Sequence, residues 1–77
     1  MKYNVTTTTT DLISGATKNA RTSFSNFDDA EDYVEAMRAE VMRSKDVLSV
    51  EYLADGEGYL IEYAPKMQIV IELSEVD

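Results

Sequence analysis

The last third of this chain alternates between apolar and polar side chains, and this alternation limits its possible folds more than any other feature. Successive side chains of a strand point to opposite faces of a sheet. We therefore expect three strands, at 47–53, 59–63 and 67–73. Their inward-facing side chains would be Leu48, Val50 and Tyr52 in the first strand, Tyr59, Ile61 and Tyr63 in the second, and Met67, Ile69, Ile71 and Leu73 in the third.

The connections between these runs agree with that assignment. Asp55-Gly56 is a common hairpin dipeptide, and a tight turn there sets Tyr52 opposite Tyr59. The loop at 64–66 sets Tyr63 opposite Met67 in the same way. Both registers keep every inward residue inward, so we predict an antiparallel meander.

The segment from Phe27 to Asp46 has the pattern of an amphipathic helix. Asp28 and Glu31 have the spacing of a capping box, which predicts that the helix begins at Asp28. Acidic residues come early and basic residues late, as the helix dipole favours. One apolar stripe would lie across the inward face of the meander: Ala30, Tyr33, Val34, Met37, Val41 and Ser44.

The β-branched residues between Tyr3 and Ile13 predict a first strand, in which the run Thr6 to Thr10 suggests a solvated edge. Ala20 to Phe24 can return as a second, antiparallel strand. The expected fold is thus one compact α+β domain over residues 1–77, in the order β-β-α-β-β-β, with a sheet of about five strands packed on one helix. Whether the first hairpin joins the same sheet stays open at this point. The chain has no cysteine, so its core must hold without disulfides.

The charge of the chain points to basic partners. Fifteen acidic residues against seven basic ones give a net charge of −8 on 77 residues. This field repels phosphate backbones and anionic lipids, so we expect no direct binding to nucleic acid or membranes. The first turns of the helix carry the densest acidic group, namely Asp28, Asp29, Glu31, Asp32 and Glu35. Two other interpretations remain open: acidity that serves solubility, and an ordinary surface helix.

The registers also define a patch on the outer face of the meander. Leu60 lies between Glu51 and Val70, with Leu53 in a neighbouring row, so a small apolar centre is rimmed by carboxylates. An interface with an apolar core and a polar edge has this appearance, and so does an ordinary solvated sheet face. The first hairpin could also cover the patch.

Catalytic side chains are scarce. The chain has neither histidine nor cysteine, which removes the commonest general base, thiol nucleophile and transition-metal ligands. Its paired carboxylates lie on an exposed helix, where nothing raises a pKa for acid catalysis or preorganises a metal site. We therefore expect no enzyme activity, no cofactor and no bound metal.

In size, acidity and lack of catalytic residues the chain resembles the small phage proteins that block host defence or nucleic-acid enzymes, among them anti-CRISPR proteins. This resemblance implies an inhibitor whose carboxylates occupy a basic site on a nucleic-acid-binding protein. The alternative is a self-associating module, such as a homodimer, that uses the outer sheet face. No apolar run approaches the ~20 residues that span a bilayer and the first residues lack the apolar region of a signal peptide, so we expect a cytoplasmic protein.

Overall fold

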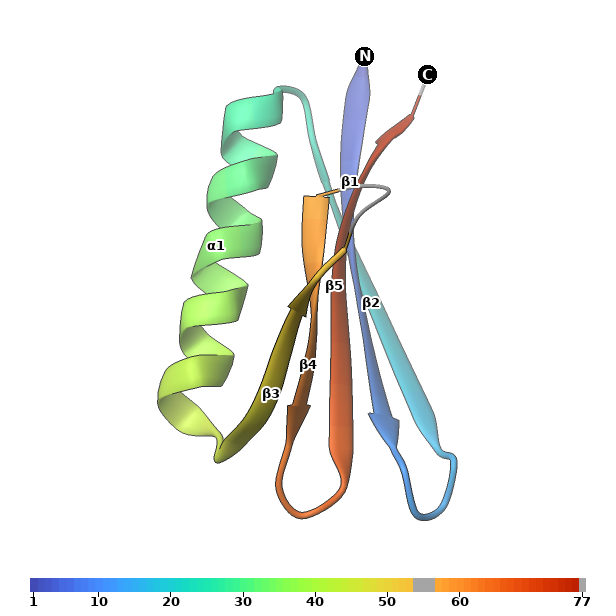
Figure 1. Ribbon diagram of the computed structural model, residues 1–77. Helices are drawn as coiled ribbons and strands as arrows, with labels where there is room; N and C mark the ends of the chain where they lie inside the picture. The colour runs from blue at the N-terminus through green and yellow to red at the C-terminus, as the bar shows by residue number, and fades with distance from the viewer. Residues whose placement is uncertain (54–56, 77) are drawn as a thin grey trace.

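The computed structural model of the protein describes residues 1–53 and 57–76. It contains a five-stranded antiparallel sheet with one helix packed on one of its faces (Figure 1). The elements in chain order are β1 (Lys2–Asp11), β2 (Thr17–Phe24), α1 (Phe27–Ser44), β3 (Val47–Tyr52), β4 (Glu57–Tyr63) and β5 (Met67–Val76). The predicted small α+β domain and its element order are confirmed. Among the described residues, no helix combines the length and the apolar character needed to cross a membrane.

The sheet order is β2-β1-β5-β4-β3, so the first hairpin joins the meander in one sheet. The pairing of β1 with β5 brings Lys2 opposite Val76 and Asp11 opposite Met67. The predicted solvated edge at Thr6 to Thr10 is therefore wrong, because β1 is paired on both sides. The run suits this position because threonine is β-branched and its hydroxyl tolerates partial exposure on both faces; all five threonines are half-buried.

The first hairpin differs from its predicted bounds at the turn. β1 ends at Asp11, not Ile13, because the Asp11 carboxylate accepts hydrogen bonds from the backbone N–H groups of Ile13 (2.9 Å) and Ser14 (3.3 Å) and so forms a turn. These bonds, that of Ile13 first, hold the pKa of the Asp11 carboxyl below its ordinary value. After this turn β2 begins at Thr17, three residues before the predicted Ala20.

The predicted meander registers are confirmed. Tyr52 lies opposite Tyr59 and Val50 opposite Ile61, while Tyr63 lies opposite Met67. The predicted turn at Asp55-Gly56 lies outside the described residues. On either side of it, the Leu53 N–H donates to the Gly58 carbonyl at 3.0 Å, as the hairpin register requires.

The inward sets of β4 and β5 are confirmed. In β3, Val50 and Tyr52 point to the helix side of the sheet as predicted, but the expected burial of this strand is wrong. The structure exposes Leu48, Val50 and Tyr52 to solvent. β3 is an edge strand, and α1 packs mainly on β5, β1, β2 and β4, so the helix does not cover it. An irregularity in the register between Val47 and Ser49 also turns Val47, in place of Leu48, toward the core.

Helix α1 buries the predicted stripe apart from Ser44. Ala30, Val34 and Val41 are buried, and Tyr33 and Met37 pack beside them. Together with the sheet they form one apolar core, whose other buried residues are Val5, Ile61, Tyr63, Ile69, Ile71 and Leu73.

The ends of α1 differ from the prediction. Its N-cap is Asn26, not Asp28: the Asn26 Oδ1 accepts from the Asp29 N–H at 2.8 Å, and its Nδ2 donates to the Asp29 carboxylate at 2.9 Å. Both pairs have the three-residue spacing of a capping box, and Asn26 takes the role because its backbone is already extended. The helix ends at Ser44, two residues before the predicted Asp46.

Candidate partner-binding surface

The acidic residues predicted to bind a partner lie on the first three turns of α1. Asp28, Asp29, Asp32 and Glu35 are exposed, and Glu31 is half-buried. Asp28, Asp32 and Glu35 follow one another at intervals of four and three residues, so they lie in one line along the helix. Asp28 and Asp29 lie in the first turn of α1, where the positive end of the helix dipole stabilises negative charge.

This line of carboxylates borders a groove between the helix and the edge of the sheet. Its volume is about 220 Å³, and we call it the α1–β4 groove. It is lined by Glu31, Asp32, Val34 and Glu35 from α1, by Tyr52 from β3, and by Gly58 and Tyr59 from β4. Position 58 requires glycine, because a Cβ there would collide with the Ile71 carbonyl oxygen. The groove therefore has acidic and aromatic walls.

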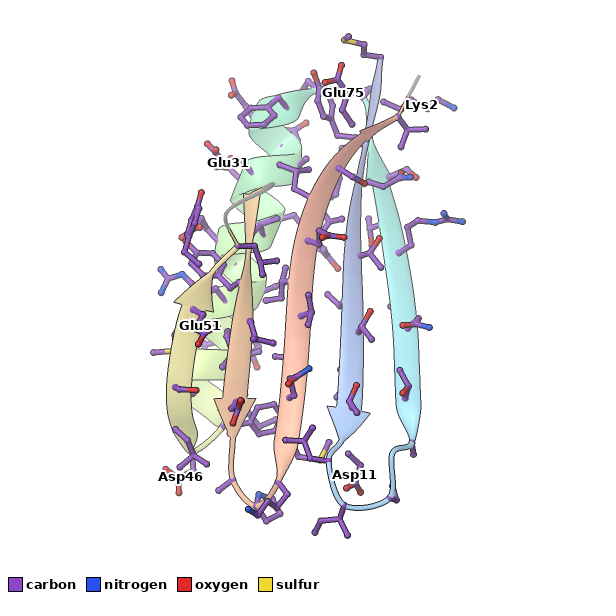
Figure 2. All side chains as sticks on the ribbon, turned by 45° about the vertical axis from the view of Figure 1, so that its right-hand side comes forward. Lys2, Asp11, Glu31, Asp46, Glu51 and Glu75 are labelled. Atoms are coloured by element: carbon purple, nitrogen blue, oxygen red, sulfur yellow. The ribbon has the colours of Figure 1, made fainter. Side chains whose placement is uncertain are left out.

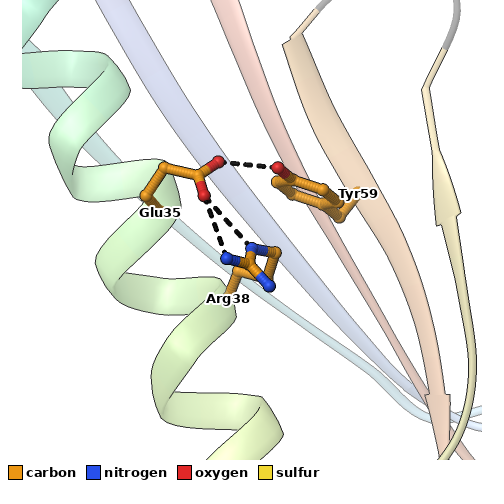
Figure 3. A network of polar contacts seen from close by, with 3 residues as sticks. All are labelled: Glu35, Arg38 and Tyr59. Carbon is orange, nitrogen blue, oxygen red and sulfur yellow. Dashed lines mark hydrogen bonds and ion pairs between the residues drawn. The ribbon is translucent and has the colours of Figure 1, made fainter.

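One wall of the groove is held by a network of three side chains (Figure 3). The Tyr59 hydroxyl donates to Glu35 at 2.7 Å, and Arg38 reaches the same carboxylate with both Nε and a terminal guanidinium nitrogen, each at 3.2 Å. The Arg38 guanidinium also lies 5.3 Å from the centre of the Tyr59 ring. This network ties the helix to β4, so the Glu35 carboxylate has a structural role.

Hydrogen bonding in this network shifts the titration of Tyr59. The bond to Glu35, with partial burial and the charge of Glu35, raises the pKa of the Tyr59 phenol above its ordinary value, although Arg38 opposes the shift. The ring of Tyr52 meets that of Tyr59 edge-on at 5.4 Å. Arg38 thus contacts both a tyrosine ring and a carboxylate. A cationic side chain of a partner could make the same two kinds of contact in this groove.

The acidic residues differ in how far the fold already uses them. Asp29 accepts from the cap residue Asn26 and Glu35 belongs to the Tyr59 network. Asp28 and Asp32 make no hydrogen bond or ion pair within the described residues. These two carboxylates lie about one helical turn apart, with Asp32 lining the groove, and are therefore the most available for a partner.

The second predicted group lies on the opposite face of the sheet. Leu60 pairs with Glu51 on one side and with Val70 on the other, as predicted. Figure 2 views this face, with Glu51 on β3 in front and Glu31 on α1 behind the sheet. Because β1 and β2 extend the sheet sideways, they do not cover the patch, and Leu53, Leu60 and Val70 are half-buried. The structure thus separates the acidic helix from the outer-face patch.

Sequence reasoning missed the tyrosines of the α1–β4 groove. Tyr52 and Tyr59 were predicted to be core residues, together with Tyr33 and Tyr63. Tyr63 is buried and Tyr33 and Tyr59 pack against the core, but Tyr52 is exposed. The alternation of apolar and polar residues correctly places Tyr52 opposite Tyr59. It does not indicate that the helix leaves β3 uncovered.

A further hollow of about 430 Å³ lies along β1 and β2, lined by Thr6, Asn19, Ala20 and Arg21. Its lining has a single charged group, Arg21. In the described part of the chain, no group of three or more acidic residues is placed to hold a metal ion.

The chain was compared with known protein families, curated proteins and solved structures. No protein-family model matches the chain, and neither curated proteins nor solved structures give a match.

Proposed function

We propose that this protein is a small acidic binding module that inhibits a nucleic-acid-binding protein by occupying its basic site. The observation that carries the proposal is a pair of carboxylates in line along α1, Asp28 and Asp32, which have no partner within the described residues. Asp32 also lines the α1–β4 groove. Carboxylates spaced along a rigid helix offer negative charges in a row, as phosphates do along a nucleic-acid strand. The net charge of −8 would steer a basic partner toward the molecule.

The groove supports the same proposal by giving the partner a place to insert a side chain. An arginine or lysine of the partner would find the Asp32 carboxylate on one wall and the Tyr52 ring on the other. Arg38 already packs on Tyr59 in this way within the chain. The phage-type inhibitor suggested by composition is the biological setting that fits such a surface.

The experiment compares two double variants of equal charge change. Tagged protein is passed over a bacterial lysate at low salt, bound proteins are eluted with a salt gradient, and the retained protein is tested for displacement from labelled DNA or RNA. We expect Asp28→Lys with Asp32→Lys to abolish retention and displacement. Glu62→Lys with Glu72→Lys, on the outer face, adds the same charge and should preserve both.

Three outcomes decide the proposal. Loss in the helix variant alone supports it, provided that circular dichroism shows an intact fold. Equal loss in both variants means that only overall charge matters and contradicts a defined binding surface. A retained partner that is not displaced from nucleic acid contradicts the inhibitor role.

A self-associating module is the second candidate, and the open outer face favours it. Among the described elements, none lies over the half-buried Leu60 and Val70 on the outer face. For this candidate, Leu60→Glu should convert an oligomer to a monomer. A chain that is already monomeric at high concentration would exclude it.

A further inference from the structure

The free edge of β3 has the features of a strand that pairs with another strand. β3 closes one side of the sheet and exposes three large apolar side chains, Leu48 (64%), Val50 (41%) and Tyr52 (64%). Edge strands with exposed apolar residues tend to pair with further strands unless charges block them. The opposite edge, β2, carries such charges in Lys18 and Arg21, whereas β3 carries only Glu51.

The hydrogen-bond pattern shows which backbone groups of β3 are available. Along an antiparallel ladder, alternate residues direct both backbone groups to the same neighbouring strand. The Leu53 N–H donates to Gly58 on β4, so Glu51 also faces β4. The backbone N–H and C=O groups of Val50 and Tyr52 therefore point away from the sheet.

The side chains of these two residues lie on the same face of the sheet as the helix. Val50 is opposite Ile61 and Tyr52 is opposite Tyr59, both of which face α1. Within the described part of the chain, the same two residues thus offer unpaired backbone groups and exposed side chains. A strand added at this edge would satisfy the backbone groups and cover part of the side chains.

A second copy of β3 fits this edge in one register. When Val50 lies opposite Val50 of the second copy, residues with outward backbone groups meet and both helices lie on the same face. Tyr52 then comes level with Leu48 of the second copy, and Glu51 lies opposite Ser49. A shift by two residues would instead place the two Glu51 carboxylates opposite each other, which like-charge repulsion disfavours.

Pairing β3 with β2 of another copy is less favourable. The Asp11 N–H donates to the Ala16 carbonyl, so Thr17, Asn19 and Arg21 turn their backbone groups outward from β2. These residues lie on the outer face, because Arg21 is level with Thr6 and Glu72. An antiparallel β3–β2 ladder would therefore put neighbouring helices on opposite faces, and chains could add without limit.

We propose that two copies of this chain pair through β3, antiparallel about a two-fold axis at Val50, and join two five-stranded sheets into one. The irregularity near Leu48 shortens the regular edge, so the interface is at the small end of specific interfaces and the dimer is weak. Each copy carries a net charge of −8, so salt screens repulsion between copies and strengthens the dimer. Binding to a basic partner has the opposite salt dependence, and this inference does not depend on it.

The test is sedimentation velocity of the whole chain, from about 10 µM to about 1 mM, at low and high salt. We expect the mass to rise from that of the 8.7 kDa monomer to twice that value with concentration, and more readily at high salt. Val50→Pro removes the outward N–H without removing a β3–β4 hydrogen bond, so it should keep the chain monomeric. Val50→Lys with Tyr52→Lys blocks the edge by charge and tests the same point if the proline variant fails to fold.

Thr8→Lys with Gln68→Lys adds the same charge on the outer face of β1 and β5, away from β3, and should leave the dimer intact. Leu60→Glu separately tests the rival outer-face interface. A chain that stays monomeric at about 1 mM in high salt overturns the proposal. Dimers that persist in a folded β3 variant, or that only Leu60→Glu disrupts, overturn it as well.

Discussion

At the scale of single residues, the contacts of Glu35 and Tyr59 define which acidic groups are structural. Glu35 is fixed between Tyr59 and Arg38, whereas Asp28 and Asp32 have no partner within the described residues. Residue type alone does not separate these carboxylates, because all of them belong to one acidic helix segment. The distinction depends on which side chains of β4 come within reach.

The raised pKa of Tyr59 gives this contact a measurable signature. Glu35→Ala removes the acceptor, so the pKa of the Tyr59 phenol should fall toward its ordinary value of 10.0, as followed by NMR of labelled tyrosine. The folded-state pKa lies above the unfolded one, so the stabilisation by this bond is present below pH 10 and is lost as pH rises through the folded pKa. Glu40→Ala, whose carboxylate pairs with Arg43, is the control and should leave Tyr59 unchanged. An unchanged Tyr59 in Glu35→Ala would contradict the hydrogen bond.

At the scale of elements, the start of α1 contains two overlapping sequence patterns, either of which could cap the helix. Asn26 with Asp29 and Asp28 with Glu31 both fit a capping box, and the fold uses the first. Tyr3 of β1 meets Phe27 edge-on at 5.7 Å, so the first helical residue is already tied to the sheet. This packing lies beyond the local pattern from which a cap is predicted.

The two candidate caps can be compared directly by mutation. Asn26→Ala removes the side chain that accepts from the Asp29 N–H, so we expect a loss of about 1 kcal/mol in the free energy of unfolding. Asp28→Ala removes an exposed carboxylate and should cost only a few tenths of that, roughly the dipole contribution of one surface charge. Urea denaturation of both variants measures the difference. A larger loss for Asp28→Ala would place the cap where the sequence first suggested it.

At the scale of the whole molecule, the excess of acidic residues acts on stability as well as on binding. Fifteen acidic side chains on so small a body repel one another, and the ion pairs of Glu35 with Arg38 and of Glu40 with Arg43 are exposed and add little. The fold must therefore rest on the apolar core between α1 and the sheet.

Salt should stabilise this fold. Between about 10 mM and about 300 mM NaCl the Debye length falls from roughly 30 Å to below 10 Å, so repulsion among the carboxylates weakens. We expect the melting temperature to rise by a few degrees, measured by circular dichroism at low micromolar protein. Glu62→Gln with Glu72→Gln changes the net charge from −8 to about −6, so the rise of the melting temperature with salt should be smaller. A melting temperature that falls with salt would show that attractive pairs outweigh the repulsion.

The sequence by itself determined the features that depend on local periodicity. The alternation within each strand predicts the meander registers, in which Val50, Ile61 and Ile69 lie opposite one another. The apolar stripe through Ala30, Val34 and Val41 predicts the buried face of the helix. Side-chain direction repeats every two residues in a strand and every 3.6 in a helix, so these assignments need no knowledge of distant segments. The acidic character of α1 is likewise a property of composition.

Only the tertiary structure decided which strands are central and which are at the edge. β1 pairs with β5, whose residues lie at the other end of the chain, and this pairing places the threonine run inside the sheet and leaves β3 outside it. The position of α1 over the other strands then exposes Tyr52 and opens the α1–β4 groove. Strand order and helix placement result from contacts between distant segments, and a local pattern of apolar residues is the same whether a strand is central or at the edge.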